Sequence, residues 1–262
     1  MLHRWFIFVI SIALPAVACA EPSTLPTFKL SGGLFISHLN TELQVNSRTI
    51  GRGTRLNLEN LGLTQSTRVG RLDGYLRLFQ RHRIQFGYFR FYRTVGAHLK
   101  NTIQVGNVTF PAGAGVDLTS DNRNYMLNYM YSFIQNDQLE LAGSLGLHIM
   151  NITNAIRGTG GRLSQSSSVT GPMPMLGLNL DYHFSKRLLG SLQGQWFAIK
   201  YDGYTGVLQD YSLRLEYMFW DHAGIGVGYN AFNLGVSVDR GNFLGRLDWR
   251  YSGLQLFGTV AF

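Results

Sequence analysis

The sequence predicts an all-β fold: a transmembrane antiparallel up-and-down β-barrel of about ten strands, preceded by a signal peptide. Three observations predict it: an apolar leader, segments with apolar residues at every second position, and connections that alternate between short and long. After the leader, no apolar run approaches the ~18 residues expected of a transmembrane helix. An exported chain without such helices spans a membrane only as a closed barrel, because lipid satisfies no open sheet edge.

The start of the chain has the three regions of a secretory signal peptide. Basic residues stand at positions 3 and 4, Trp5–Val17 is apolar, and Ala18-Cys19-Ala20 is a small-x-small cleavage site. An apolar stretch of about 13 residues is too short for a spanning helix, which needs ~20. We therefore expect a signal peptide over 1–20 and an outer-membrane β-barrel domain over 21–262. Cleavage before Cys19, giving a lipoprotein, is the alternative, although its lipobox is poor.

The alternation defines the individual strands. The 262-residue chain contains 31 glycines and 6 prolines, which suits strands separated by glycine-rich connections rather than disorder. Read with period two, the chain gives these expected strands: Phe28–Leu39, Val69–Phe79, Arg83–Val95, Asn122–Phe133, Leu139–Ile152, Met173–Phe184, Leu188–Tyr201, Val207–Phe219, Ala223–Val238 and Phe243–Phe262.

The connections sort by length and by the residue that precedes them. Turns at 80–82, 134–138, 185–187 and 220–222 are short, whereas 40–68, 96–121 and 154–172 are long, polar and glycine-rich. Short periplasmic turns and long extracellular loops are typical of membrane barrels. The strands before the short turns, and the chain itself, end on phenylalanine, which predicts an aromatic ring at the periplasmic interface. Its members are Phe79, Phe133, Phe184, Phe219 and Phe262.

The polar face of the strands indicates which side meets lipid. A water-soluble barrel or sandwich would also show alternation, but with its apolar set inside. Here the polar set contains charges of both signs separated by small residues, and each basic residue on a lipid face costs ~2–4 kcal/mol near the midplane. We therefore expect a lumen charge network formed by Arg71, Asp73, Arg77, Glu140, Asp181, Arg214 and Glu216.

With its signal peptide, amphipathic segments, alternating loops and terminal strand LQLFGTVAF, the chain from Phe28 to Phe262 resembles a Gram-negative outer-membrane β-barrel protein. The resemblance implies insertion into the cell outer membrane, with lipid and lipopolysaccharide as neighbours. It also implies that the barrel-assembly machinery reads the C-terminal strand. Phe257 stands where such strands often have glycine, so the assembly signal is imperfect. No subfamily of known activity, and no oligomeric state, follows from the residues.

No constellation of catalytic or metal-binding residues stands out. Asp181 and His183 have the spacing of an Asp-His dyad, but they lie beside a short turn, opposite the rim at which an omptin-like protease works. Ser37 and His38 are adjacent and so point to opposite faces of a strand. His148 points inward and either joins an interior network or has no role. Scattered histidines and the lack of an acidic loop predict no metal and no cofactor.

The long loops carry a slight basic excess, which is typical of a solvated loop surface and would as the alternative favour contact with lipopolysaccharide phosphates. Nucleic-acid binding is not expected of an exported chain of this kind. Two loop segments, 54–63 and 102–110, have strand character, and Gly106-Asn107 suits a tight turn in the second. If one of them spans the membrane, the strand count becomes twelve. The charged residues expected to face outward are Arg48, Arg52, Arg55, Lys100, Arg157, Arg162, Arg240, Glu42, Glu59, Asp117, Asp121, Asp202 and Asp239.

The functional prediction is a non-enzymatic barrel with a mostly filled lumen and a structural or surface-interaction role. Ten strands enclose little more space than side chains fill, and Tyr75, Phe89 and Phe197 would occupy much of it. A narrow porin-like channel for small solutes is the first alternative, because interior charges also line water paths. An enzyme with a site at the extracellular rim is the second.

Overall fold

The computed structural model describes residues 25–46, 53–161, 163–201, 203–240 and 243–262, so the predicted signal peptide lies outside the described residues. No helix in these ranges is long and apolar enough to cross a membrane. Ten long strands form the barrel: β1 (Phe28–Asn46), β3 (Ser66–Phe79), β4 (His82–His98), β7 (Gly115–Gln135), β8 (Leu139–Gly158), β9 (Ser164–His183), β10 (Leu188–Tyr201), β11 (Tyr204–Met218), β12 (Ala223–Arg240) and β13 (Phe243–Ala261).

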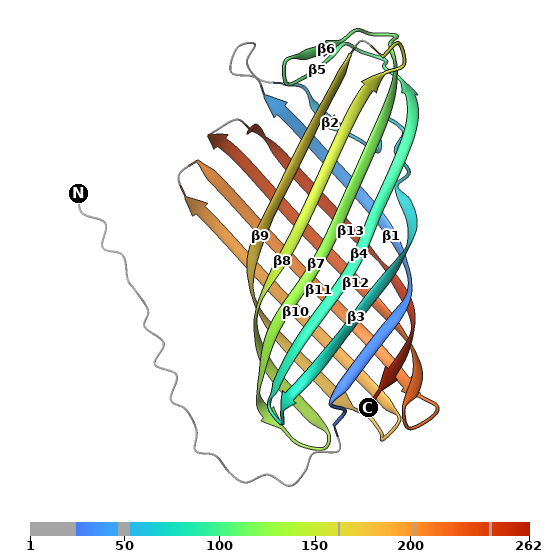
Figure 1. The fold of residues 1–262 in the computed structure, drawn as a ribbon, viewed down its shortest axis with the longest axis vertical. Coiled ribbons are helices and arrows are strands. Elements are labelled where there is room, and N and C mark those ends of the chain that lie inside the picture. Colours follow the sequence, from blue (N-terminus) through green and yellow to red (C-terminus); the bar gives the residue numbers. More distant parts are fainter. Residues whose placement is uncertain (1–24, 47–52, 162, 202, 241–242) are drawn as a thin grey trace, which may run out of the picture.

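The barrel is antiparallel and closes between its first and last strands (Figure 1). Each strand pairs with the next barrel strand, and β1 pairs with β13 from Lys29↔Ala261 to Asn46↔Leu244. Glycines let the two strands approach closely at this seam. A Cβ on Gly33 would lie 2.0 Å from the carbonyl oxygen of Leu256, and one on Gly253 would lie 2.1 Å from that of Ile36. The expected ten-strand closed barrel is confirmed.

Several strands are longer than predicted at their upper ends, opposite the short turns. β1 extends to Asn46 rather than Leu39, β7 begins at Gly115 rather than Asn122, and β9 begins at Ser164 rather than Met173. The stretches expected to be loops therefore contain much of the upper wall. These extensions were missed because their outward residues are polar and small, so they lack the outward apolar stripe of the segments below.

Neither strand-like loop segment spans the membrane, so the twelve-strand alternative is wrong. β2 (Arg55–Asn57) pairs only with the upper part of β1. β5 (Ile103–Val105) and β6 (Val108–Phe110) form the short hairpin that Gly106 suggested, and Gly106 has a φ of 57°. Both features lie at the upper end of the barrel (Figure 1).

An apolar exterior band surrounds the lower barrel. Its lower limit is the phenylalanine ring, in which Phe79, Phe184 and Phe262 expose 71%, 60% and 62% of their surface. Its upper limit is a girdle of outward aromatic residues that includes a hydrogen bond of 2.7 Å from Trp196 Nε1 to the Tyr211 hydroxyl. Along β10, the two limits are separated by about the 9–11 residues that a tilted strand needs to cross a bilayer. The other girdle residues are Tyr88, Tyr125 and Tyr229.

Above the girdle, the polarity of the two barrel faces reverses. On β1, Leu39 and Leu43 point inward and are buried, whereas the alternating His38 and Asn40 are exposed. The inward side chains join a hydrophobic core with residues of β2 and the β5–β6 hairpin. Water, rather than lipid, surrounds this part of the wall, so apolar side chains are buried inside. The sequence analysis placed the apolar set outside throughout, and this is wrong for the upper half.

The upper barrel is split between β9 and β10, whose upper ends diverge in Figure 1. Pairing of these strands ends at Trp196↔Leu176, although β9 stays paired with β8 up to Ser164. Even-numbered residues of β9 direct their backbone groups toward β10, as the bond from Phe184 N to Leu188 O shows. Pro172 and Pro174 are also even-numbered, and proline has no backbone N–H. They therefore cannot donate the hydrogen bonds that further pairing with β10 would need.

Candidate functional site in the lumen

A layer of aromatic side chains divides the lumen into two compartments. The six rings are buried and pack edge-to-face or stacked, with Phe232 and Tyr251 at a centroid distance of 4.8 Å and Phe89 and Phe91 at 5.2 Å. Such packing leaves few voids larger than a water molecule. The layer consists of Phe35 (β1), Phe89 and Phe91 (β4), Phe232 (β12), and Trp249 and Tyr251 (β13).

Below the aromatic layer lies a cavity of about 890 Å³. Its walls are the inward faces of the lower strands, and its mouth is formed by turn residues such as Lys186, Asp221 and His222. The mouth is therefore on the periplasmic side. Leu25 and Pro26, which precede β1, also line it. We call this space the lower cavity and treat it as the candidate functional site.

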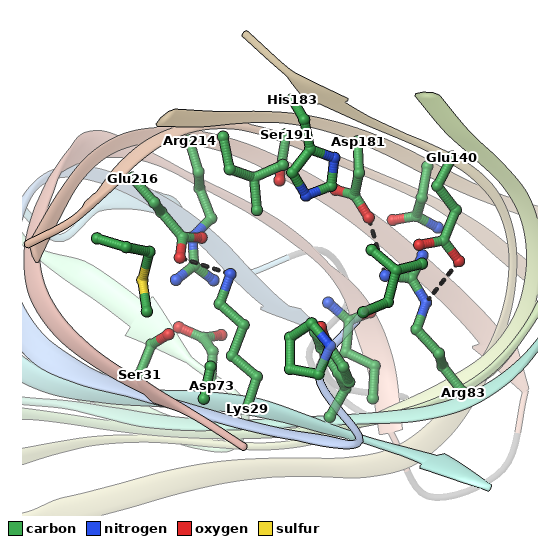
Figure 2. A pocket seen from close by; sticks show the side chains of 18 of the residues that line it. Lys29, Ser31, Asp73, Arg83, Glu140, Asp181, His183, Ser191, Arg214 and Glu216 are labelled. Carbon is green, nitrogen blue, oxygen red and sulfur yellow. Dashed lines mark hydrogen bonds and ion pairs between the residues drawn. The ribbon is translucent and has the colours of Figure 1, made fainter. Parts of the chain in front are cut away.

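All seven residues of the predicted network point into the lower lumen. On one side, Arg77 donates to both carboxylate oxygens of Glu140, at 3.1 and 2.9 Å. Ser132 also donates to Glu140. Arg83 reaches the same cluster, with Nη1 at 2.8 Å from Asp181 and Nε at 3.5 Å from Glu140 (Figure 2). Two carboxylates thus balance two buried guanidinium groups, as burial of charge requires.

A second cluster lies on the opposite side of the lower cavity (Figure 2). Lys29 Nζ is 2.5 Å from Glu216, and Arg214 Nε is 3.6 Å from the same carboxylate. The Arg214 guanidinium also lies over the Phe257 ring, at 4.1 Å from its centroid. Here one carboxylate stands between two cations, so the Arg214 charge is only partly compensated.

The third cluster lies directly beneath the aromatic layer. Arg71 Nε is 2.9 Å from Asp73, and Arg71 also donates to Asn230 at 3.0 Å. Gln255 donates to the same Asp73 oxygen, Oδ2, at 3.0 Å. The guanidinium of Arg71 lies 5.2 Å from the centroid of Phe89, a cation–π contact that joins the charges to the aromatic layer.

Four inward residues that the sequence analysis did not select complete these clusters: Lys29, Arg83, Asp210 and Gln255. Strand parity would have found two of them, since Arg83 shares the parity of Phe89 on β4 and Asp210 shares that of Arg214 on β11. Of the aromatic residues expected in the lumen, Phe89 belongs to the aromatic layer and Tyr75 lines the lower cavity. Phe197 lies higher, against the upper core.

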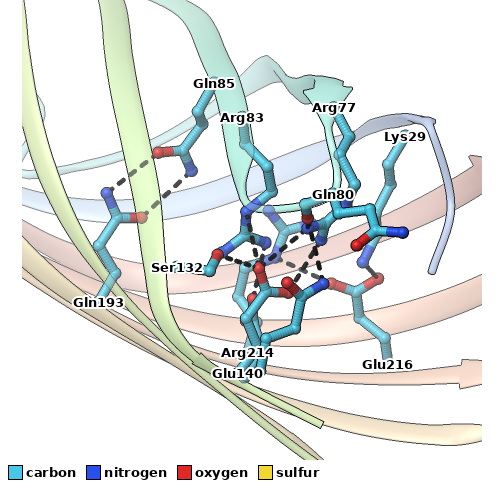
Figure 3. Close-up of polar contacts among 12 residues, drawn as sticks. Lys29, Arg77, Gln80, Arg83, Gln85, Ser132, Glu140, Gln193, Arg214 and Glu216 are labelled. Carbon is cyan, nitrogen blue, oxygen red and sulfur yellow. Dashed lines mark hydrogen bonds and ion pairs between the residues drawn. The ribbon is translucent and has the colours of Figure 1, made fainter. Parts of the chain in front are cut away.

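Amide side chains cross the lumen between the charge clusters and the aromatic layer. Gln85 of β4 and Gln193 of β10 exchange two hydrogen bonds of 3.3 Å from opposite walls (Figure 3). Asn128 donates to Gln85 at 3.0 Å. His148 is buried beside them and lies 2.9 Å from the Gln195 side-chain oxygen, so it belongs to an interior network. These bonds hold facing strands together across a narrow lumen.

The described residues give a rim site little support. Asp181 and His183 line the lower cavity, at the periplasmic end. Ser37 is buried and His38 exposed, on opposite faces of β1. Within the described ranges, no three His, Cys, Asp or Glu side chains are grouped to hold a metal ion. Glu59, expected to face outward, is instead buried and accepts from Arg93 Nη1 at 2.7 Å, because the segment after β2 folds inward. Of the other loop charges, Arg48, Arg52, Arg162, Asp202 and the Arg240 side chain lie outside the described residues.

Comparison with known proteins shows the fold. No protein-family model and no curated protein matches the sequence. Among solved structures, the outer membrane protease OmpT from Escherichia coli superposes with a TM-score of 0.61 at 9% identity, covering 93% of this chain and 99% of OmpT. Ail of Yersinia pestis, the attachment invasion locus protein, gives 0.37 at 10% identity, covering 89% and 99%. OprG from Pseudomonas aeruginosa gives 0.34 at 10% identity, covering 91% and 96%.

The chain thus has the fold of Gram-negative outer-membrane β-barrel proteins, and this fold implies an outer-membrane location. At 9% identity, the similarity to OmpT concerns the fold alone. One fold can carry unrelated functions, so the fold leaves the activity open. The activity therefore has to be inferred from the lumen and the outer surface.

Proposed function

We propose that this protein is a non-enzymatic outer-membrane barrel with a blocked lumen and a structural or surface-interaction role. The aromatic layer carries the proposal. It lies across the lumen from β1, β4, β12 and β13, and its rings are in mutual contact. The rings belong to one hydrophobic core with the buried Met175 and Leu208 of the facing strands, so a water path would have to cross close-packed apolar side chains.

The upper core supports the same conclusion independently. Leu56 and Leu58, in and after β2, are 7% and 4% exposed and pack inside the upper barrel. Phe110 of the β5–β6 hairpin is fully buried there. Removing an apolar side chain from such a site costs about 2–5 kcal/mol, so these segments stay seated rather than opening freely. Two successive barriers therefore separate the lower cavity from the cell exterior.

Planar-bilayer conductance tests this proposal against the channel alternative. The full-length barrel should give no current step above noise, and neither should a variant with the β5–β6 hairpin removed, because the aromatic layer remains. Leu99 N and Ala114 O are 2.9 Å apart, so the ends of the excised segment are already adjacent. A steady ohmic current abolished by Arg214→Ala would overturn the blocked-lumen proposal and establish a channel through the charged lumen.

The enzyme alternative has less support in the described residues. The upper histidines, His38 and His98, are on outward positions and neither bonds to a serine or a carboxylate there. Nucleophilic or acid–base catalysis needs such contacts within about 3 Å. A peptidase assay on folded protein in lipopolysaccharide tests the point: sustained turnover of a peptide library would contradict the non-enzymatic proposal.

The proposed surface partner is lipopolysaccharide, and the barrel-assembly machinery is the proposed partner of β13. Exposed basic side chains ring the exterior just above the aromatic girdle, where headgroup phosphates lie. Arg90 and Arg123 flank Asp121 there, at 2.7 and 3.0 Å. Replacing Arg90 and Arg123 together by Gln should weaken lipopolysaccharide binding. It should also make that binding less dependent on salt concentration. The other basic residues of this tier are Arg68, Lys200 and Arg250.

A further inference from the structure

We infer that the lower cavity is a binding site for a small solute bearing a phosphate or carboxylate group, which enters from the periplasmic side. A volume of about 890 Å³ lies in the range of small-molecule sites, ~300–1,000 Å³. A purely structural lumen of ten strands would be filled by side chains, as the interior above the aromatic layer is. The space below has instead been left open, and charged side chains of both signs line it.

The unpartnered polar groups of the cavity wall are predominantly donors. Asn179 is 5% exposed and Arg83 is 4% exposed, yet Asn179 Nδ2 and Arg83 Nη2 have no hydrogen-bond partner. Arg214 Nη2 and His183 Nδ1 are also buried without one. Buried polar groups in native proteins are nearly always satisfied. Groups of this kind call for a ligand rich in acceptor oxygens.

The strand register gathers Arg214, Asn179 and His183 on one wall, and the Arg83 side chain reaches that wall from β4 through its contact with Asp181. Ser191 of β10 pairs with Arg214 of β11 on one side and with Asp181 of β9 on the other. Asn179 and His183 stand two residues before and after Asp181, so they share its inward face. Figure 2 shows His183, Ser191, Asp181 and Arg214 along this wall. The donors therefore surround a single patch centred on Ser191.

The protein's own carboxylates contact other nitrogen atoms of these arginines and leave Arg83 Nη2 and Arg214 Nη2 without an acceptor. Asp181 accepts from Arg83 at 2.8 Å and from the Ser191 hydroxyl. Glu216 lies 2.5 Å from Lys29, so Arg214 shares this carboxylate with a second cation. Stacking on Phe257 holds the Arg214 guanidinium in place. A planar guanidinium with free N–H groups binds phosphate or carboxylate in a bidentate manner.

Calorimetric titration of the folded barrel in detergent with inorganic phosphate tests the inference, with ionic strength held constant by sodium chloride. We expect saturable binding that Arg214→Gln weakens by about tenfold to a hundredfold, the range for a lost hydrogen bond to a charged group. Asn179→Ala should weaken it less. Arg246→Gln, on the outer surface of the upper barrel and outside the basic tier above the girdle, is the matched control and should leave the affinity unchanged. Acetate in a parallel titration distinguishes a carboxylate site from a phosphate site.

A labelling experiment gives a second readout that does not depend on the arginine variants folding. The chain's only cysteine is Cys19, so a Ser191→Cys variant places a unique thiol in the barrel, and the unsubstituted protein is its blank. Phosphate should slow the reaction of this thiol with an anionic thiosulfonate. No saturable titration, an affinity unchanged by Arg214→Gln, or labelling indifferent to phosphate would overturn the inference. Binding lost only in Arg246→Gln would also do so, by placing the anion outside.

Discussion

The lower and upper halves of this barrel are built from the same strands but with opposite polarity. Below the girdle, β8 turns Leu145 and Leu147 outward and Glu140 and His148 inward. Above it, the same strand turns Asn151 outward and buries Ile152 inside. The lower half is closed around a charged cavity, whereas the upper half is split between β9 and β10 around an apolar core.

The difference shows that the surroundings of the wall, rather than the strand itself, decide which face is apolar. Lipid outside the lower half makes outward charges costly, so the ionic groups pair inside. Water outside the upper half restores the ordinary hydrophobic effect. The aromatic layer inside lies close to the level at which the exterior changes, with Phe89 of the layer adjacent in sequence to Tyr88 of the girdle and to the exposed Arg90.

The largest effect is expected from removing the aromatic layer's biggest member. Trp249 is fully buried, so Trp249→Ala should lower the free energy of unfolding by about 3–5 kcal/mol. Chemical denaturation of the barrel in liposomes, followed by heat-modifiable migration, measures the loss. Trp220→Ala is the control, because that side chain is 71% exposed at a periplasmic turn. A Trp249 variant as stable as wild type would mean that the upper core does not support the barrel.

A smaller effect is expected from placing the same charge on the same face of one strand, below and above the girdle. Leu145→Arg should destabilise by about 2–4 kcal/mol, because its side chain projects into lipid. Asn151→Arg lies six positions further along the outward face of β8 and should cost close to nothing, since it meets headgroups or water. Equal losses of unfolding free energy for the two variants in liposomes would contradict a membrane boundary between positions 145 and 151.

The smallest effect is expected at the split. Replacing Pro172 and Pro174 by Thr restores two N–H donors opposite β10 and should let the pairing extend beyond Trp196. We expect slower amide exchange at Ala198 and Lys200, which direct their backbone groups to this side, and a stability gain of about 1 kcal/mol. Unchanged exchange at both residues would show that the splay of the walls, rather than the prolines, keeps the strands apart.

The sequence predicted the lower half better than the upper. The outward stripe of β11, which includes Leu213 and Leu215, repeats every second residue and stands out because a lipid-facing surface is continuously apolar. Upper segments such as 164–171 of β9 are rich in serine and looked like loops, since neither lipid nor alternation marks them. Glu59 was placed outside for the same reason: a fold-back that buries a loop carboxylate against Arg93 has no periodic signature.

By itself the sequence determined the barrel, its approximate strand number and seven of the charged residues that face the lumen. Alternation, turn length and terminal aromatic residues are local consequences of a strand that meets lipid on one side. Only the tertiary structure decided which charges pair, where the rings of β1, β4, β12 and β13 meet, and how much space stays open beneath them. Those contacts join residues as far apart as Ser31 and Thr259, whose approach depends on barrel closure rather than on any neighbouring residue.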